Sequence, residues 1–294
     1  MSIPSDVWRE WGAPPLELAL MLLPAIWYAV GVRALWRSAG VGHGVSRLRA
    51  ASFATGIGVL ALALASPIDA AAEAIFSAHM VQHLLLILVS APLLVLGAPS
   101  LPAVWALPRA SRRAVGRWWH GAVALRAVVH AVTAPGAAFV LHFVALWFWH
   151  MPAPYQAALR SPGMHALEHL SFLGTAFLFW WTVATPLGRP RAREGQGIAM
   201  MVGTLMHSGA LGALLMFAAT PWYPAHDAGA RAWGITAMDD QQLAGLIMWI
   251  PAGAVYVAAA GWLFVSWMRH DERRQVGRVS AQRQPKSLRL EELA

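Results

Sequence analysis

Four long stretches without charged side chains constrain the fold of this chain more than any other feature of its sequence. Each is longer than the roughly 20 apolar residues that an α-helix needs to cross a bilayer. Charged residues make up 12% of the chain, about half the share found in soluble domains. These features exclude a water-soluble globule and a disordered chain, and they predict an all-α integral membrane protein. The uncharged stretches cover residues 74–108, 127–159, 195–226 and 241–268.

The apolar pattern predicts seven transmembrane helices, packed as a bundle over residues 15–268. Residues 1–14 are expected to form a short extracytoplasmic segment before the first helix. Residues 269–294 are polar and basic, and we expect them to form a disordered cytoplasmic tail. The predicted spans are Pro15–Trp36, Leu48–Ser66, Glu73–Leu96, Thr133–Trp149, His165–Leu187, Gln196–Thr220 and Gln241–Met268.

The uneven distribution of basic residues predicts the orientation of the bundle. Nineteen of the 22 Lys and Arg residues fall in three alternate loops and in the tail, and the exceptions are Arg9, Arg160 and Arg231. Because Lys and Arg collect on the cytoplasmic side of membrane proteins, the amino terminus is expected outside and the carboxyl terminus in the cytoplasm. The same rule accounts for the net charge of +8, so we expect no nucleic-acid partner.

The cysteine count limits the kinds of metal site that the chain can build. With no cysteine, the chain cannot form disulfides, thiolate nucleophiles or cysteine-based zinc and copper sites. It holds twelve histidines and twelve methionines, so a soft-metal site would use imidazole and thioether ligands. In the predicted orientation, eight of the histidines lie near the midplane, in the outer half of the helices or in outer loops.

Two histidine pairs stand out by their spacing. His79 and His83 are four residues apart on the third predicted span, and His165 and His169 are four apart on the fifth. On a helix such a pair projects from one face, so both rings of each pair can reach one ion. His79 is expected about two turns below the outer surface, where a polar side chain is costly and functional by default. The pairs therefore predict a metal site on the outward-facing side.

Four other positions allow two interpretations each. His207 and Met80 are candidate ligands, although both could be ordinary packing residues of apolar helices. Asp240 lies in a polar run at the start of the seventh span, where an acid either caps the helix or faces the site. His226, in the last outer loop, is interpreted as a structural residue rather than a ligand.

Four motifs follow one another along the chain: SAHMVQHLLL from Ser77, WHMP from Trp149, HALEHLSF from His165 and DQQLAG from Asp240. Together they resemble the caa3-type cytochrome c oxidase assembly factors, the Caa3_CtaG family. The resemblance covers about residues 50–268 and implies a non-enzymatic, multi-pass protein of the bacterial plasma (inner) membrane. It implies a role in building haem–copper oxidase, with a membrane-embedded oxidase subunit as partner and a copper donor protein as a second one. The candidate metal positions that it implies are His79, His83, His150, His165, His169 and Asp240.

Copper is the metal that we expect, ahead of zinc, because Cu(I) accepts imidazole and thioether ligands. A first alternative is a haem-binding membrane protein, in which histidines of two facing helices are axial ligands. A second is a copper transporter, which would require polar side chains through the nearly apolar cytoplasmic half. His165-Ala-Leu-Glu168-His169 also matches a zinc-peptidase pattern. The role that suits Glu168 better is to orient a metal-bound imidazole, by accepting a hydrogen bond from the ring nitrogen that does not bind the metal.

Overall fold

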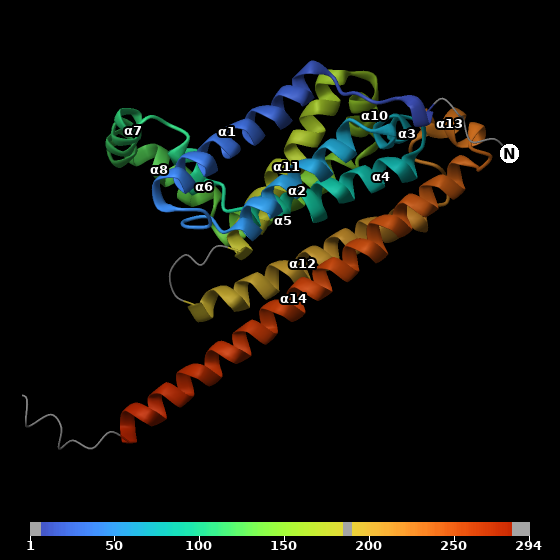
Figure 1. The fold of residues 1–294 in the computed structure, drawn as a ribbon. Coiled ribbons are helices and arrows are strands. Elements are labelled where there is room, and N and C mark those ends of the chain that lie inside the picture. The colour runs from blue at the N-terminus through green and yellow to red at the C-terminus, as the bar shows by residue number, and fades with distance from the viewer. Residues whose placement is uncertain (1–6, 185–189, 284–294) are drawn as a thin grey trace, which may run out of the picture.

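A computed structural model describes residues 7–184 and 190–283, and all regular elements in these two ranges are helices (Figure 1). Proline begins many of them, because its fixed φ suits the first turn and its missing N–H costs nothing there. The helices are η1 (Val7–Arg9), α1 (Pro15–Ala39), α2 (Arg47–Leu64), α3 (Pro67–Ala74), α4 (Phe76–Leu84), η2 (Leu85–Ser90), α5 (Ala91–Leu96), α6 (Ser100–Trp105), α7 (Arg109–Gly121), α8 (Val123–Val132), α9 (Pro135–Trp149), α10 (Pro152–Arg160), α11 (Pro162–Ala184), α12 (Pro190–Met216), η3 (Pro224–His226), α13 (Asp227–Ala232) and α14 (Ala237–Arg283).

Within residues 7–184 and 190–283, five helical segments are long and apolar enough to cross a membrane, or six if the bent pair α8 and α9 counts as one span. The axis turns by 65° between α8 and α9, at the break before Pro135. α11, the fifth predicted span, is not among the five, because two histidines and a glutamate in its first half lower its mean hydropathy. The described part of the chain is thus all-helical, with five to six candidate spans.

The third predicted span is divided near its start. Ile75 is extended, with φ −131° and ψ 140°, and it separates the short helix α3 from α4. α4, the π-helical turn η2 and α5 then follow without interruption over residues 76–96. A π-turn before Pro92 accommodates a residue that has no N–H to donate to the preceding turn. The histidine pair of α4 lies just before this turn.

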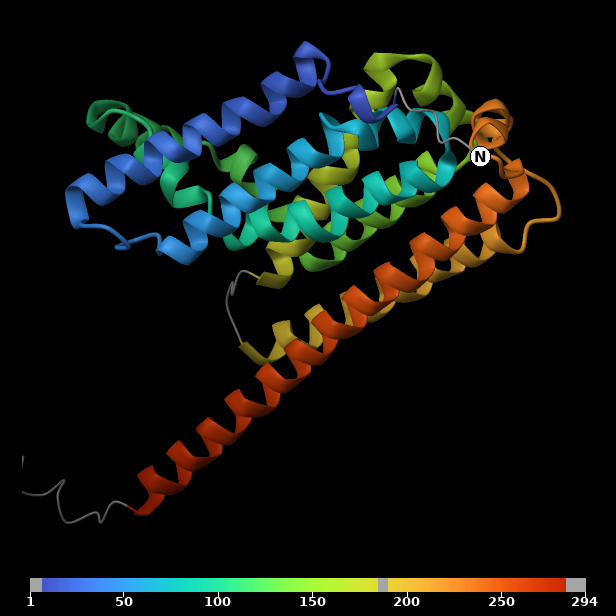
Figure 2. The same ribbon diagram turned by 45° about the vertical axis from the view of Figure 1, so that its right-hand side comes forward.

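The carboxyl-terminal helix is longer than the sequence predicted. α14 continues through Arg283, so residues 269–283 extend the seventh predicted span instead of forming a disordered tail. Arg and Gln account for seven of the 15 residues of this segment and favour helix. Residues 284–294 of the predicted tail lie outside the described residues. α12 and α14 run side by side as a long pair, visible in both views (Figures 1 and 2).

The main hydrophobic core lies where α4, α9, α11, α12 and α14 meet. Phe172, Phe179 and Tyr256 are among its fully buried side chains. α1 and α2 build two smaller clusters with residues of η2 and α5, and α1 packs closely on α6. The largest group of buried polar side chains is set between the main core and α1, and its members come mostly from α4 and α11.

Candidate metal centre

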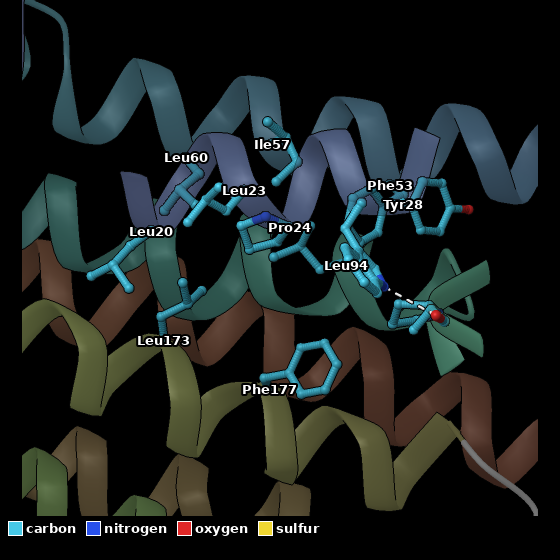
Figure 3. Close-up of a pocket in the computed structure, with 13 residues that line it drawn as sticks. Leu20, Leu23, Pro24, Tyr28, Phe53, Ile57, Leu60, Leu94, Leu173 and Phe177 are labelled. Carbon is cyan, nitrogen blue, oxygen red and sulfur yellow. Dashed lines mark hydrogen bonds between the residues drawn. The ribbon is translucent and has the colours of Figure 1, made fainter. Parts of the chain in front are cut away.

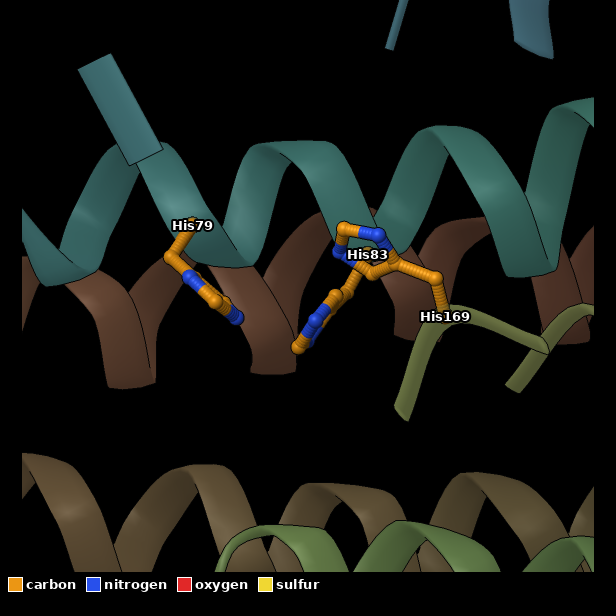
Figure 4. A group of neighbouring side chains, drawn as sticks. All are labelled: His79, His83 and His169. Atoms are coloured by element: carbon orange, nitrogen blue, oxygen red, sulfur yellow. The ribbon is translucent and has the colours of Figure 1, made fainter. Parts of the chain in front are cut away.

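The two predicted histidine pairs meet in the interior of the protein. The ring centroids of His79 and His83 on α4 lie 4.3 Å apart, and those of His165 and His169 on α11 lie 4.2 Å apart. Across the helix interface, His79 and His165 are 5.6 Å apart and His83 and His169 are 5.8 Å apart. The four-residue spacing therefore gives the shared faces that the sequence predicted, and the two faces contact each other. Figure 4 shows His169 of α11 beside the α4 pair His79 and His83.

Backbone carbonyls orient two imidazoles toward this cluster. His79 Nδ1 lies 3.3 Å from the carbonyl oxygen of Ala72, and His150 Nδ1 lies 2.7 Å from that of Leu146. A carbonyl oxygen only accepts hydrogen bonds, so Nδ1 carries the proton in both rings. The lone pair is then on Nε2, the nitrogen through which each ring can bind a metal.

Glu168 brings a carboxylate between the two pairs. Its Oε2 lies 3.9 Å from His79 Nε2, and its Oε1 lies 3.8 Å from His83 Nε2. Glu168 and His79 are fully buried, and neither carboxylate oxygen has a hydrogen-bond partner among residues 7–184 and 190–283. A buried carboxylate is costly unless it is hydrogen-bonded or lies beside a cation. A bound metal ion would satisfy both oxygens.

A second carboxylate reaches the cluster from α1. Glu17 is 6% exposed, and its Oε1 lies 3.9 Å from His169 Nδ1. Sequence reasoning missed this contact with the centre. The signal was present in the sequence, because Glu17 is the single acid in the first predicted span, whose one other charged residue is Arg33 near the opposite end.

Three overlapping sets of residues have the geometry for metal binding. In each set, ligand atoms from all three residues lie within 4.8 Å of one another. Four-coordinate ions hold nitrogen ligands at about 2.0–2.1 Å, which places neighbouring ligands about 3.4 Å apart. Small side-chain rotations would therefore close any of the sets around an ion. The sets are His79, His83 and His169; Glu17, His165 and His169; and His79, His165 and Glu168.

Aromatic residues from the neighbouring connections close one side of the cluster. Tyr155 Oη and His226 Nε2 are hydrogen-bonded at 2.7 Å, and Tyr223 Oη donates to the carbonyl of His150 at 2.6 Å. Burial lowers the pKa of His226 to about 4, and burial raises the pKa of Tyr223 above its ordinary value. The ring of His226 lies 6.4 Å from that of His79, so this residue, interpreted from the sequence as structural, borders the site.

The other predicted ligands lie at different distances from this cluster. His150 is at its edge, with its ring 6.2 Å from that of His83. Met80 is packed in the main hydrophobic core. The carboxylate of Asp240 accepts hydrogen bonds from the backbone N–H groups of Phe76 and Ser77, at 2.7 and 2.9 Å. It thus caps α4, a helix distant in the sequence, whereas the sequence interpretation concerned the start of its own helix.

His207 lies in a separate environment on α12. Its ring contacts Phe143 of α9 at a centroid distance of 4.8 Å and Phe139 at 5.7 Å. His142, which neighbours these residues on α9, has its Nδ1 3.1 Å from Thr175 Oγ1. The structure therefore brings together His79, His83, His165 and His169, with His150 beside them, and it leaves His207 outside the three sets.

A polar pocket and an apolar groove adjoin the centre. The pocket, of about 360 Å³, is lined by Glu10, Asp69 and Glu73 among others. Asp69 Oδ1 accepts a hydrogen bond of 2.6 Å from Gln82 Nε2, on the histidine-bearing helix α4. Burial raises the pKa of Asp69 to about 6; the Gln82 hydrogen bond opposes this shift and the nearby Glu73 adds to it.

The apolar groove runs between α1 and α11 and is lined also by α2 and α5 (Figure 3). The part shown encloses about 460 Å³. An adjoining cavity of about 390 Å³ shares Leu20, Pro24 and Leu173 with it and is bounded at one end by Glu17 and His169. The centre thus lies beside an apolar space between α1 and α11.

Comparisons with known proteins agree with the motifs. A family model described as "Cytochrome c oxidase caa3 assembly factor (Caa3_CtaG)" matches residues 26–270. Uncharacterized proteins of Mycobacterium bovis and Mycobacterium tuberculosis are each 28% identical over 271 residues, which is 90% of this chain. The chain spans 40% of the length of these relatives. No solved structure matches the chain.

Proposed function

Because the chain belongs to the Caa3_CtaG family of cytochrome c oxidase assembly factors, we propose that it binds copper in the histidine centre and delivers it to the oxidase. The acceptor is a membrane-embedded oxidase subunit, and a copper donor protein supplies the metal. The protein acts without catalysing a reaction. The observation that carries the proposal is the buried cluster of imidazole nitrogens and carboxylate oxygens that two facing helices, α4 and α11, bring together.

The ligand chemistry supports copper as the cargo. Cu(I) and Cu(II) both bind imidazole, and the affinity order of divalent metals favours Cu(II) over Zn(II) at a nitrogen site. We assign His79, His83, His165 and His169 as the principal ligands, with Glu168 as a charge-balancing partner and His150 as an additional ligand. Overlapping ligand sets also allow the ion to be released by successive ligand exchanges, which suits delivery better than storage.

The spacing of the rings favours copper over haem. Four imidazole rings share the cluster, and neighbouring centroids lie between 4.2 and 5.8 Å apart. A porphyrin between two axial histidines is much wider than these gaps, so it would displace the other two rings.

A copper transporter would need further ligands along the bundle, beyond the four-histidine cluster. His142 and His207 are the histidines in that part of the bundle.

Delivery within the membrane also requires a defined topology. We propose seven spans, with α11 crossing the bilayer despite its polar first half, the amino terminus outside and the carboxyl terminus in the cytoplasm. The basic residues of the α6–α8 region and of the end of α14 support this orientation. The histidine centre would then open toward the outer side of the plasma membrane.

Metal analysis of the detergent-purified protein tests the proposal. We compare the wild type, His79→Ala/His83→Ala and the control His207→Ala, each before and after incubation with Cu(I). The wild type and the control are expected to hold copper, and the double variant is expected to lose most of it, because it retains two of the four principal ligands. A wild type that binds no copper, or a double variant that binds as much as the control, would overturn the proposal. A Soret band in the purified protein would indicate haem instead.

A further inference from the structure

His169 is the residue that the all-histidine ligand set and the set containing Glu17 have in common. One set, with His79 and His83, offers only nitrogen, and the other, with Glu17 and His165, includes a carboxylate. The two nitrogens of an imidazole point in divergent directions, so both cannot bind the same ion. Both ring nitrogens of His169 are buried, and neither has a hydrogen-bond partner within the described ranges 7–184 and 190–283.

Glu17 supports a second ion position on the α1 side of His169. The Oε1 atom of Glu17 faces His169 Nδ1, and its buried Oε2 lacks a hydrogen-bond partner in the part of the chain that the structure describes. This carboxylate is placed in an apolar helix, where nothing but a cation or a donor would compensate its burial. α1 brings it to the centre from outside the residues that the family model matches, which begin at 26.

We propose that the centre holds metal in two adjacent positions that share His169, the second of them completed by Glu17. The inference rests on the proposed metal-binding function and extends it. His79 and His83 with one nitrogen of His169 form the first position, and Glu17 and His165 with its other nitrogen form the second. Transfer between them is a ligand exchange at the His169 ring, in which one metal–nitrogen bond breaks as another forms, without a change of oxidation state.

The second position differs from the first in chemistry and in surroundings. A carboxylate is a harder, negatively charged ligand, so this position suits a divalent ion better than the all-nitrogen position does. Glu17 and His169 also bound the apolar cavity of about 390 Å³ between α1 and α11. The second position is therefore the one beside the lateral groove, and it is suited to receive or release metal on that side of the bundle.

Titration with Cu(II) alone, followed by electron paramagnetic resonance, tests the two positions. The unmodified protein is expected to bind two ions, and His169 gives up its ring N–H proton to the buffer when both of its nitrogens bind metal. The second addition should broaden or attenuate the signal of the first, because the imidazolate bridge couples the spins. Glu17→Gln is expected to bind one ion and to keep an uncoupled mononuclear signal. Glu10→Gln, which removes an exposed carboxylate shortly before α1, is the matched control and should behave as the wild type.

The outcomes separate this inference from the proposed function. A wild type that binds a single ion, with the same uncoupled spectrum in Glu17→Gln, overturns the second position and leaves the copper centre intact. A wild type that binds no copper overturns both. The coupled spectrum of the unmodified protein supports the inference independently of whether Glu17→Gln folds. His165→Ala is a second variant, which removes a ligand of the second position that lies on α11, whereas Glu17→Gln removes the ligand that lies on α1.

Discussion

At the scale of single residues, polar side chains in apolar helices carried most of the predictive information. His79, His83, His165 and His169 could be identified because a four-residue spacing fixes a shared face whatever the tertiary structure is. Glu17 could not be placed in the same way, since a single acid in a helix gives no indication of what it faces. Its contact with His169 depends on how α1 lies against α11, which is a long-range property of the fold.

Asp69 provides a pH-dependent prediction at this scale. Its pKa is raised to about 6, mainly by burial, so the folded protein binds this proton more tightly than the unfolded chain does. Stability contributed by the protonated form is therefore lost as the pH rises from about 4 to about 6, and it changes little above that window. Asp69→Asn cannot ionise, and it retains a carbonyl oxygen for the hydrogen bond from Gln82.

The measurement is the difference in thermal unfolding between Asp69→Asn and the wild type in detergent, at several pH values from 4.5 to 7.5. We expect the free energy of unfolding of the variant to increase relative to that of the wild type as the pH rises, by roughly 1–2 kcal/mol after allowance for partial exposure of Asp69. A difference that stays constant across this range would mean that the carboxyl of Asp69 titrates as it does in the unfolded chain.

At the scale of elements, the sequence predicted most helices but not where their axes break. The third predicted span was expected to be continuous from Glu73, whereas Ile75 interrupts it and Asp240 caps the new helix α4. Asp240 is 164 positions away from Phe76 along the chain, so no local pattern could reveal this cap. The cap fixes the first turn of α4 and with it the position of His79.

The contact between α1 and α6 gives a second prediction. A Cβ atom at Gly31 would lie 2.0 Å from the backbone carbonyl oxygen of Pro102, which cannot move aside as a flexible side chain could. Gly31→Ala should therefore destabilise the protein by about 1–3 kcal/mol, the usual cost of overpacking. Gly58→Ala on α2 is the matched control, since no described atom lies within 4 Å of its added Cβ. Relative to the wild type, the temperature of thermal unfolding should fall for Gly31→Ala and rise slightly for Gly58→Ala, because alanine favours helix over glycine where space allows.

At the scale of the whole molecule, composition predicted a helical membrane protein, and five to six of the described helical segments are candidate spans. The seventh predicted span coincides with α14, and the fifth coincides largely with α11, whose histidines and glutamate reduce its apolar character. Hydropathy thus underestimates the membrane-spanning character of the helix that carries the candidate site, because the residues that we propose as metal ligands are the ones that oppose membrane insertion. A topology experiment is therefore needed to show that α11 crosses the bilayer.

The absence of cysteine makes this experiment direct, since any introduced thiol is the only one in the chain. Ala228→Cys on α13 and Ala114→Cys on α7 both place the thiol at exposed positions of short connecting helices. In intact cells with a permeabilised outer envelope, a membrane-impermeant maleimide should label the cysteine at 228 within minutes. It should label the cysteine at 114 only after the plasma membrane is disrupted. Equal labelling of both would place α7 and α13 on the same side and contradict the proposed orientation.

A third cysteine, at Ala153 of α10, tests whether α11 is a span. If α11 crosses the bilayer, α10 lies outside, as α13 does, and α12 returns the chain to that side. The cysteine at 153 should then be labelled with the one at 228, whereas a cysteine at Gly195, just before the apolar part of α12, should be protected with the one at 114. Labelling of the cysteine at 195 in intact cells would mean that α11 does not span the bilayer, and the metal centre would then lie in a re-entrant helix instead of a transmembrane one.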